Sequence, residues 1–304
     1  MKKHDVAVIG TIFVDVKGFS HQAYHPQGRN IGNVAFFHGG VGRNIAETMA
    51  QLDVQTAFVS TADLTGLSTE VLQRLEHHQV DTTYTIQTEN GMGMYMAILD
   101  DKGDLAGSIS QMPSLDEMEG ALLKQVDDIV QKSKAIALEI DLNEKIAETY
   151  VQKAVQHQTP IYGIPGNLDV LYKRMDLLEH IQCFILNEIE TEKLSGIVPD
   201  TMEDAKTAAE FFIQKGLKQV VITLGERGCY FYDALTGEHG PLSPQRVEVV
   251  DATGAGDSFF AGTVSALVKG ETLAEAVKLG TRVAGVTISI PESTCQDLQE
   301  RLRG

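Results

Sequence analysis

Apolar and polar positions alternate along the chain in two regular patterns. Short apolar runs with the length of buried strands occur at Val6–Ile9, Ala57–Val59, Ala135–Ile140, Phe184–Leu186 and Val220–Leu224. Amphipathic stretches with helical spacing lie between them, at Ile45–Leu52, Ser68–His78, Asn143–His157 and Met202–Lys215. Strands and helices in alternation indicate βαβ units. The sequence therefore predicts an α/β fold, a doubly wound and mostly parallel sheet with helices on both faces.

Two segments, residues 11–38 and 91–110, break this alternation. No helical pattern is clear in the first. In the second, Met94–Leu99 and Leu105–Ile109 read as the strands of a hairpin, and the Asp-Asp-Lys-Gly sequence between them has turn chemistry. Strand-rich insertions often cover active sites. We expect the two segments to form a small β-sheet lid on one domain that spans residues 1–304.

The composition narrows the functional classes. Of 304 residues, 43% are apolar, enough for one large α/β domain with a sizeable core, and the formal net charge is -17. An acidic surface repels phosphate backbones and anionic lipids, so neither nucleic acid nor a membrane surface is an expected partner. The N-terminal residues lack a secretory pattern, no apolar stretch reaches about 18 residues, and no two cysteines form a C-x-x-C pair. We therefore expect a cytoplasmic protein.

The most informative motif is DATGAGDSFFAG at residues 251–262. Its small-residue loop precedes an apolar helix, which the pattern places at Phe259–Val268. Backbone N–H groups can converge on an anion where such a loop meets a helix N-terminus, and the helix dipole adds positive potential. We therefore predict an anion hole for a transferring phosphoryl group. Its residues are Thr253, Gly254, Ala255 and Gly256.

Asp257 stands at the mouth of this loop. A carboxylate there can accept the proton of an attacking hydroxyl, which makes Asp257 the candidate catalytic base. The alternative is that Asp257 only caps the helix. Other phosphate loops are excluded, because neither G-x-x-x-x-G-K-[ST] nor G-x-G-x-x-G occurs in the sequence.

Residues 251–257 resemble the C-terminal signature of the ribokinase-like (PfkB) carbohydrate and nucleoside kinases. The GGVGRNIA run at residues 39–46 resembles the N-terminal signature of the same family, and the resemblance covers essentially the full length. It implies the ribokinase-like fold and an ATP-dependent phosphotransferase with an alcohol group as acceptor. In the family the two strand-rich segments form a lid over the sugar, and members with a lid often form homodimers through it.

The resemblance assigns four residues to the sugar. Gly39 and Gly40 permit a tight backbone approach, and Asn44 is expected to open the following helix and to hydrogen-bond hydroxyl groups. Asp15 follows the first strand, and its carboxylate can accept both protons of a vicinal diol. The alternatives are a plain glycine-rich turn with an Asn cap, and a solvated Asp in a turn.

Metal sites are also implied by the resemblance. Asn187 and Glu190 match an N-x-x-E element that orders the Mg2+ shell, with contact to the ion through water. The alternative for this pair is an ordinary helix start. Asp251 and Thr253 match positions that help to bind a monovalent cation, such as K+, in some members.

A third element concerns the nucleotide. Thr223, Gly225 and Gly228 belong to a T-L-G-x-x-G run at the end of a buried strand, which resembles the element that approaches ATP in the family. A hairpin turn into the next strand is compatible with that role.

The most specific prediction concerns the acceptor of the phosphoryl group. Val14–His21 and Gly39–Asn44 are most like the corresponding runs of pseudouridine kinases. We therefore expect phosphorylation of pseudouridine at its 5′-hydroxyl, with apolar cover for the base from Phe19, Phe36 and Met94.

Three places in the chain depart from the family pattern. Phe13 replaces a common Asn, Ile164 replaces the Asp of an Asp-Pro pair, and Ile185-Leu186 replaces Lys-Pro before Asn187. A kinase of another nucleoside, of a free sugar or of a sugar phosphate therefore stays open, with ribose, fructose and fructose 6-phosphate as examples. A ligand-binding protein without turnover is a third reading, against which the complete loop at residues 253–257 argues.

Overall fold

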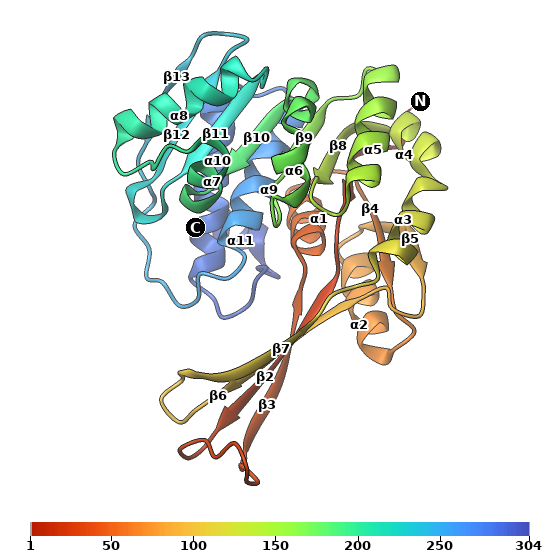
Figure 1. Cartoon of the computed structure of the whole chain (residues 1–304), viewed down its shortest axis with the longest axis vertical. Helices are drawn as coiled ribbons and strands as arrows, with labels where there is room; N and C mark the ends of the chain where they lie inside the picture. The colour runs from red at the N-terminus through yellow and green to blue at the C-terminus, as the bar shows by residue number, and fades with distance from the viewer. Residues whose placement is uncertain (1, 304) are drawn as a thin grey trace.

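A computed structural model describes residues 2–303 of the protein (Figure 1). Within this range a nine-stranded sheet has the order β13-β12-β11-β10-β9-β8-β1-β4-β5. Its strands are β1 (His4–Ile9), β4 (Thr56–Ala62), β5 (Asp81–Gln87), β8 (Ser133–Glu139), β9 (Ile161–Ile164), β10 (Cys183–Leu186), β11 (Gln219–Thr223), β12 (Cys229–Asp233) and β13 (His239–Leu242). Neighbours from β5 to β11 pair in parallel, and β12 and β13 add an antiparallel edge.

Helices cover both faces of this large sheet (Figure 1). They are α1 (Val41–Gln51), α2 (Gly66–His77), α3 (Leu115–Leu123), α4 (Val126–Lys132), α5 (Glu144–Gln156), α6 (Asp169–Lys173), α7 (Glu188–Ser195), α8 (Met202–Gln214), α9 (Ala255–Val268), α10 (Leu273–Ile288) and α11 (Leu298–Arg303), with short 3-10 turns η1 (Met175–His180) and η2 (Gly225–Arg227). None of the described helices is both long and apolar enough to cross a membrane.

The core has two layers because strand side chains alternate between the faces of the sheet. Val6 and Val8 of β1 pack into a cluster with residues of α1, α2, α9 and α10, whereas Ala7 and Ile9 pack into a second cluster with residues of α3, α4, α5 and α8. The strands are buried on both faces, as the continuous apolar runs predict. The doubly wound α/β prediction is confirmed.

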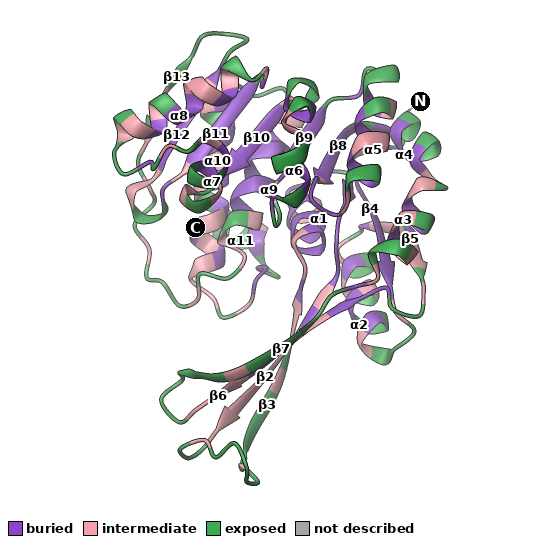
Figure 2. Cartoon of the chain, in the orientation of Figure 1, coloured by how far each residue is buried: buried purple, intermediate pink, exposed green. Residues whose placement is uncertain are grey.

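A second sheet of four strands extends away from the large sheet (Figure 1). Its order is β3-β2-β6-β7, with β2 (Phe13–Ser20), β3 (Gly32–Gly39), β6 (Gly93–Leu99) and β7 (Leu105–Gln111). The predicted hairpin is present, because Asp100 Oδ1 accepts hydrogen bonds from the backbone N–H groups of Lys102 and Asp104. Figure 2 shows that most of this small sheet is exposed or half-buried, unlike the large one.

The two faces of the small sheet differ in chemistry. The register places Asp15 opposite Phe37 of β3 and Tyr95 of β6, so these three side chains share one face, here called the inner face. The other face, here called the outer face, carries exposed apolar side chains: Val34, Phe36, Met96 and Ile109. Phe36 and Met94, predicted together with Phe19 to cover the base, do not share the face of Phe19. They pair with Val16 and Val14 and so lie on the outer face.

Candidate active site

Asn44 and Asp257, from the two predicted signatures, are in direct contact. The Nδ2 group of Asn44 in α1 donates a hydrogen bond to Oδ2 of Asp257 in α9, at 2.7 Å. The two helices start near the carboxyl end of the large sheet, where ligands bind in open α/β folds. The structure therefore brings the predicted sugar loop and the predicted phosphoryl loop to one place.

The N-terminus of α9 has the features of an anion-binding site. The helix begins at Ala255, four residues earlier than predicted, and its N-cap is Gly254 with φ of 78°. A Cβ atom on Gly254 would lie 2.3 Å from the carbonyl oxygen of Ser293, so only glycine fits there. A Cβ atom on Gly256 would meet no atom within 4 Å. Open space therefore lies beside the first turn of α9.

The donors in this turn are not equivalent. The N–H of Thr253 donates to Oδ1 of Asp251 at 2.8 Å, and the N–H of Ala255 donates to the carbonyl of Ala252. Within residues 2–303, the N–H groups of Gly254, Gly256 and Asp257 donate to no protein acceptor. Three unpaired N–H groups beside open space fit a phosphoryl group.

Asp257 is the third residue of α9 and does not cap it, so the capping alternative is wrong. Burial raises the pKa of its carboxyl to about 6, although the Asn44 hydrogen bond and the nearby Arg43 charge act in the opposite direction. Such a carboxylate is mostly ionised at neutral pH and remains basic enough to accept a proton.

Asp15 follows the first strand, β1, as predicted, and it lies inside β2, so the alternative of a solvated Asp in a turn is wrong. Its carboxylate oxygens lie 3.5 Å from the position that a Cβ atom on Gly39 would occupy, so the carboxylate rests against the Gly39 backbone. Burial raises the pKa of Asp15, while the charges of Lys17 and Arg43 lower it. A half-buried carboxylate on the inner face can bind hydroxyl groups.

The glycine loop leads directly into α1. Gly40 is the N-cap with φ of 98°, and a Cβ atom there would lie 2.5 Å from the carbonyl oxygen of Thr11. The helix begins at Val41. Asn44 therefore lies at its fourth position and neither opens nor caps the helix, which corrects the expectation from the sequence. Its side chain is free to reach Asp257.

Glu139 is a further candidate for the site, and no sequence motif indicated it. It ends β8 and is half-buried, and its Oε2 accepts a hydrogen bond from the N–H of Thr11 at 2.9 Å. Burial, together with the charges of the Asp257 and Asp141 carboxylates, raises its pKa to about 7, although the Thr11 hydrogen bonds act in the opposite direction. The sequence pattern that could have indicated Glu139 is an acidic residue at the carboxyl end of a buried strand, where burial of a charge is costly.

Asn187 and Glu190 form a reciprocal cap at the start of α7. Asn187 Oδ1 accepts from the N–H of Glu190 at 2.9 Å, and Glu190 Oε2 accepts from the N–H of Asn187 at 2.8 Å. Burial raises the pKa of Glu190, and the charges of Asp141 and Asp257 contribute. The carboxylate therefore belongs to the same acidic surroundings as Asp257. No group of three or more acidic, His or Cys side chains among the described residues could hold a metal directly. The site fits Mg2+ that is held mainly by water and phosphate oxygens.

The predicted nucleotide element forms the turn between β11 and β12. Thr223 ends β11, and its hydroxyl donates to the carbonyl of Leu186 at 3.2 Å. Gly228 needs its positive φ of 91°, and a Cβ atom there would lie 2.1 Å from the carbonyl oxygen of Leu242. A Cβ atom on Gly225 would meet nothing within 4 Å, so open space lies beside that residue.

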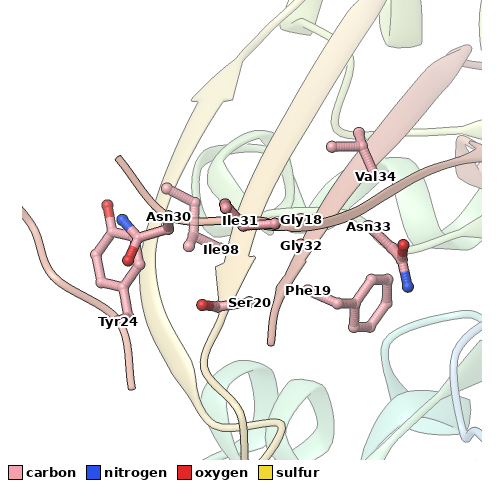
Figure 3. Close-up of a pocket in the computed structure, with 10 residues that line it drawn as sticks. All are labelled: Gly18, Phe19, Ser20, Tyr24, Asn30, Ile31, Gly32, Asn33, Val34 and Ile98. Atoms are coloured by element: carbon pink, nitrogen blue, oxygen red, sulfur yellow. The ribbon is translucent and has the colours of Figure 1, made fainter. Parts of the chain in front are cut away.

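A separate cavity of about 300 Å³ lies at the far end of the small sheet. Figure 3 shows the side chains that line it, among them Tyr24, Asn30 and Ile98 together with Phe19 and Asn33. Ile98 pairs with Gly18 and lies on the outer face, whereas Phe19 and Asn33 pair with each other on the inner face, so residues of both faces line the cavity. Phe19, which the sequence predicts to cover the base, lines this cavity, whereas the residues predicted to hold the sugar, the phosphoryl group, the nucleotide and the metal do not.

Comparison with known proteins agrees with this geometry. The sequence pattern of the pfkB family carbohydrate kinases matches residues 3–298. Guanosine-inosine kinase of Exiguobacterium acetylicum is 35% identical over 289 residues, which cover 95% of each protein. Pseudouridine kinase of Escherichia coli is 30% identical over 299 residues, 98% of this chain and 94% of that protein. The chain therefore belongs to the pfkB family of carbohydrate kinases, and it is an ATP-dependent phosphotransferase.

The fold of the chain also has a solved counterpart. Arabidopsis thaliana ribokinase, solved with ribose and ATP, superposes with a TM-score of 0.84 at 20% identity, and the match covers 99% of both chains. The ribokinase-like fold with an added small sheet is thereby confirmed.

Proposed function

We propose that this protein transfers the γ-phosphoryl group of ATP to the 5′-hydroxyl of a nucleoside, with Asp257 as the catalytic base. The contact of Asn44 with Asp257 carries the proposal, because it joins a hydroxyl-binding loop to an anion hole around one ionisable carboxylate. In the transfer, the acceptor oxygen forms a bond to phosphorus, the bond to the ADP oxygen breaks, and the hydroxyl proton moves to Asp257.

The remaining residues have roles that follow from their placement. Asp15, the Gly39-Gly40 backbone and Asn44 would hold the sugar, and Glu139 would accept a further hydroxyl proton. The unpaired N–H groups of Gly254, Gly256 and Asp257 would stabilise charge on the transferring phosphoryl group, with Thr253 and Ala255 shaping the turn. The open space beside Gly225, in the turn that Thr223 and Gly228 support, would receive part of the nucleotide.

Metal ions complete the proposed site. Glu190, with Asn187 fixing its orientation, would hold water molecules of a Mg2+ ion. Bound Mg2+ would neutralise phosphate charge. Asp251 and Thr253 stay the candidates for a monovalent cation such as K+, since the Asp251 carboxylate orders the backbone that leads into α9.

The inner face of the small sheet supports a nucleoside over a free sugar. Asp15 would anchor the ribose diol, and it lies between Phe37 and Tyr95 in the sheet. Aromatic rings at these positions can stack on a nucleobase. We propose that residues 11–38 and 91–110 act as a lid, which excludes water from the phosphoryl group.

The relatives define two candidate acceptors. Guanosine and inosine come first, because the guanosine-inosine kinase is 35% identical to this chain. Pseudouridine comes second, on the 30% identity of the pseudouridine kinase and on the likeness of residues 14–21 and 39–44. Both are ribonucleosides, and both would present the same diol to Asp15.

The decisive experiment is ADP release with a panel of acceptors: guanosine, inosine, pseudouridine, uridine, ribose, fructose and fructose 6-phosphate. The Asp257→Asn variant is the matched blank for contaminating kinases. A nucleoside with the highest kcat/KM supports the proposal, and the panel ranks the two candidates. A higher kcat/KM for ribose or a fructose derivative would refute the nucleoside assignment and leave the family unaffected.

We also propose that a second copy of the chain covers the outer face. Val34, Phe36, Met96 and Ile109 are 42–71% exposed on this one face, an apolar surface of the kind that marks protein contacts. Phe36→Asp should therefore shift a dimer to monomer in sedimentation experiments. Leu235→Asp, at an equally exposed site on the β12–β13 turn, is the control. A native chain that sediments as a monomer at all concentrations contradicts the proposal.

A further inference from the structure

Ser293 touches the opposite end of the amide that binds Asp257. It lies in the segment after α10 and is 8% exposed. Its Oγ lies 3.2 Å from Oδ1 of Asn44 and 2.9 Å from the carbonyl oxygen of His38. Ser293 is far from both signatures in the sequence, and no motif singled it out.

Arg43 donates a hydrogen bond to this hydroxyl. Its Nη2 lies 3.3 Å from Ser293 Oγ and also donates to the carbonyl of His38. The guanidinium is fully enclosed, and its Nη1 donates to Glu47 at 2.7 Å and to Thr294 Oγ1 at 3.2 Å. Because a guanidinium can only donate, Ser293 must accept from Arg43 and direct its own hydrogen elsewhere.

The acceptors of that hydrogen are not equal. The His38 carbonyl is the nearer acceptor and can accept twice, but it already accepts from Arg43, whereas Asn44 Oδ1 has no other donor among the described residues. A hydrogen bond from Ser293 to Oδ1 determines which end of the amide faces α9. The Nδ2 end then faces Asp257, and the reverse orientation would place an amide oxygen against a carboxylate.

We propose that Ser293, held by Arg43, is a positioning residue that locks the Asn44 amide with its N–H donor toward Asp257. The inference rests on the proposed role of Asp257 as the base. Without the lock the amide would rotate, and the carboxylate would lose its neutral donor.

The surroundings of Asp257 make this donor important. Asn44 and Arg43 face it from α1, and both favour its ionised form. Glu139 of β8 and Glu190 of α7 are acidic and interact unfavourably with it. Burial also favours the protonated form. Loss of the Asn44 donor should therefore move the protonation of Asp257 to higher pH.

The test is the pH dependence of kcat/KM for Ser293→Ala. Its acidic limb should move up by about 0.5 to 1 pH unit, which is a loss of about two- to fivefold at pH 6 and little change at pH 8.5. Ser293→Thr keeps the hydroxyl and should restore the native limb. Thr294→Val is the matched control, since Thr294 contacts Arg43, Arg74 and Glu47 but not Asn44. It should lower the melting temperature and leave the limb in place.

A double-mutant cycle separates positioning from packing. If Ser293 acts through Asn44, adding Ser293→Ala to Asn44→Ala should cause no further shift of the limb. An unchanged limb in Ser293→Ala, an equal shift in Thr294→Val, or an additive shift in the double variant would overturn the inference. A fully active Asp257→Asn variant would instead refute the proposed base. An inactive Asp257→Asn variant with a native limb in Ser293→Ala would refute the positioning role alone.

Discussion

The Nζ of Lys17 in the small sheet lies 3.9 Å from Oδ2 of Asp251, which precedes the anion-binding turn of α9. Lys17 also lies over the ring of Phe37 and shares the inner face with Asp15, two residues away on β2. Both charged side chains are partly exposed, so the pair adds little to stability. The Lys17 ammonium group instead lies between the proposed sugar site and the proposed phosphoryl site.

Lys17→Gln should therefore lower activity without loss of stability. We expect kcat/KM to fall about tenfold, because a positive charge near the transferring phosphoryl group is lost. The melting temperature should stay unchanged. Lys102→Gln, in the exposed turn of the same sheet, is the control and should behave as the native enzyme. A melting temperature that falls with activity would point to a structural role for Lys17.

Replacement of the proposed base should abolish chemistry and spare ATP binding. Asp257→Asn should reduce kcat by about two to four orders of magnitude, and ATP affinity measured by calorimetry should persist because the backbone donors remain. In the native enzyme, kcat/KM should fall below about pH 6, since burial raises the pKa of Asp257 to about 6 and the base works only when ionised. A near-native kcat in the variant would exclude Asp257 as the base.

Glu139 should reduce stability at alkaline pH. Its pKa is raised to about 7 in the folded protein, from an ordinary value of 4.5, so the folded state binds more protons between these values. Stability from this group therefore falls as pH rises through that window. Glu139→Gln can still accept from Thr11, and it should raise the free energy of unfolding by about 1–3 kcal/mol at pH 8 and by almost nothing at pH 4.5. Denaturant titrations at the two pH values measure this difference. A gain of equal size at both would contradict the assignment.

The magnesium requirement should depend on Glu190. Glu190→Gln keeps the shape of the cap and removes the charge, so the Mg2+ concentration for half-maximal activity should rise several-fold. Glu192→Gln, an exposed acid on the same helix, serves as the control. Identical Mg2+ titrations for both variants would show that Ile185 and Leu186 belong to a site with a different metal arrangement.

The small sheet should become protected when the acceptor binds. If residues 11–38 and 91–110 close over the sugar, hydrogen exchange of their amides should slow with the acceptor that the panel identifies. ATP alone should protect residues 219–290 and leave the small sheet exposed. Protection limited to residues 219–290 with both substrates bound would contradict a lid.

The sequence alone determined the order of the main elements and the family. Apolar runs such as Val220–Leu224 and the turn chemistry around Asp100 are local signals. In the structure, the run lies in a buried strand, and Asp100 accepts hydrogen bonds within its turn. The small residues at 253–256 predicted an anion site because their conformational freedom is a property of the residues themselves. The start of α9 was placed too late, because a turn of small residues looks like a loop until the cap at Gly254 is known.

The tertiary structure decided which distant side chains meet. The contacts of Asn44 with Asp257 and with Ser293 depend on how α1, α9 and the segment after α10 pack, and no local pattern encodes that packing. Glu139 joined the site only because parallel strands bring their carboxyl ends together. The structure places Phe36 and Met94 on the outer face, whereas the sequence could not assign them to a face. Strand register sets the direction of every side chain, and a shift of one residue reverses it.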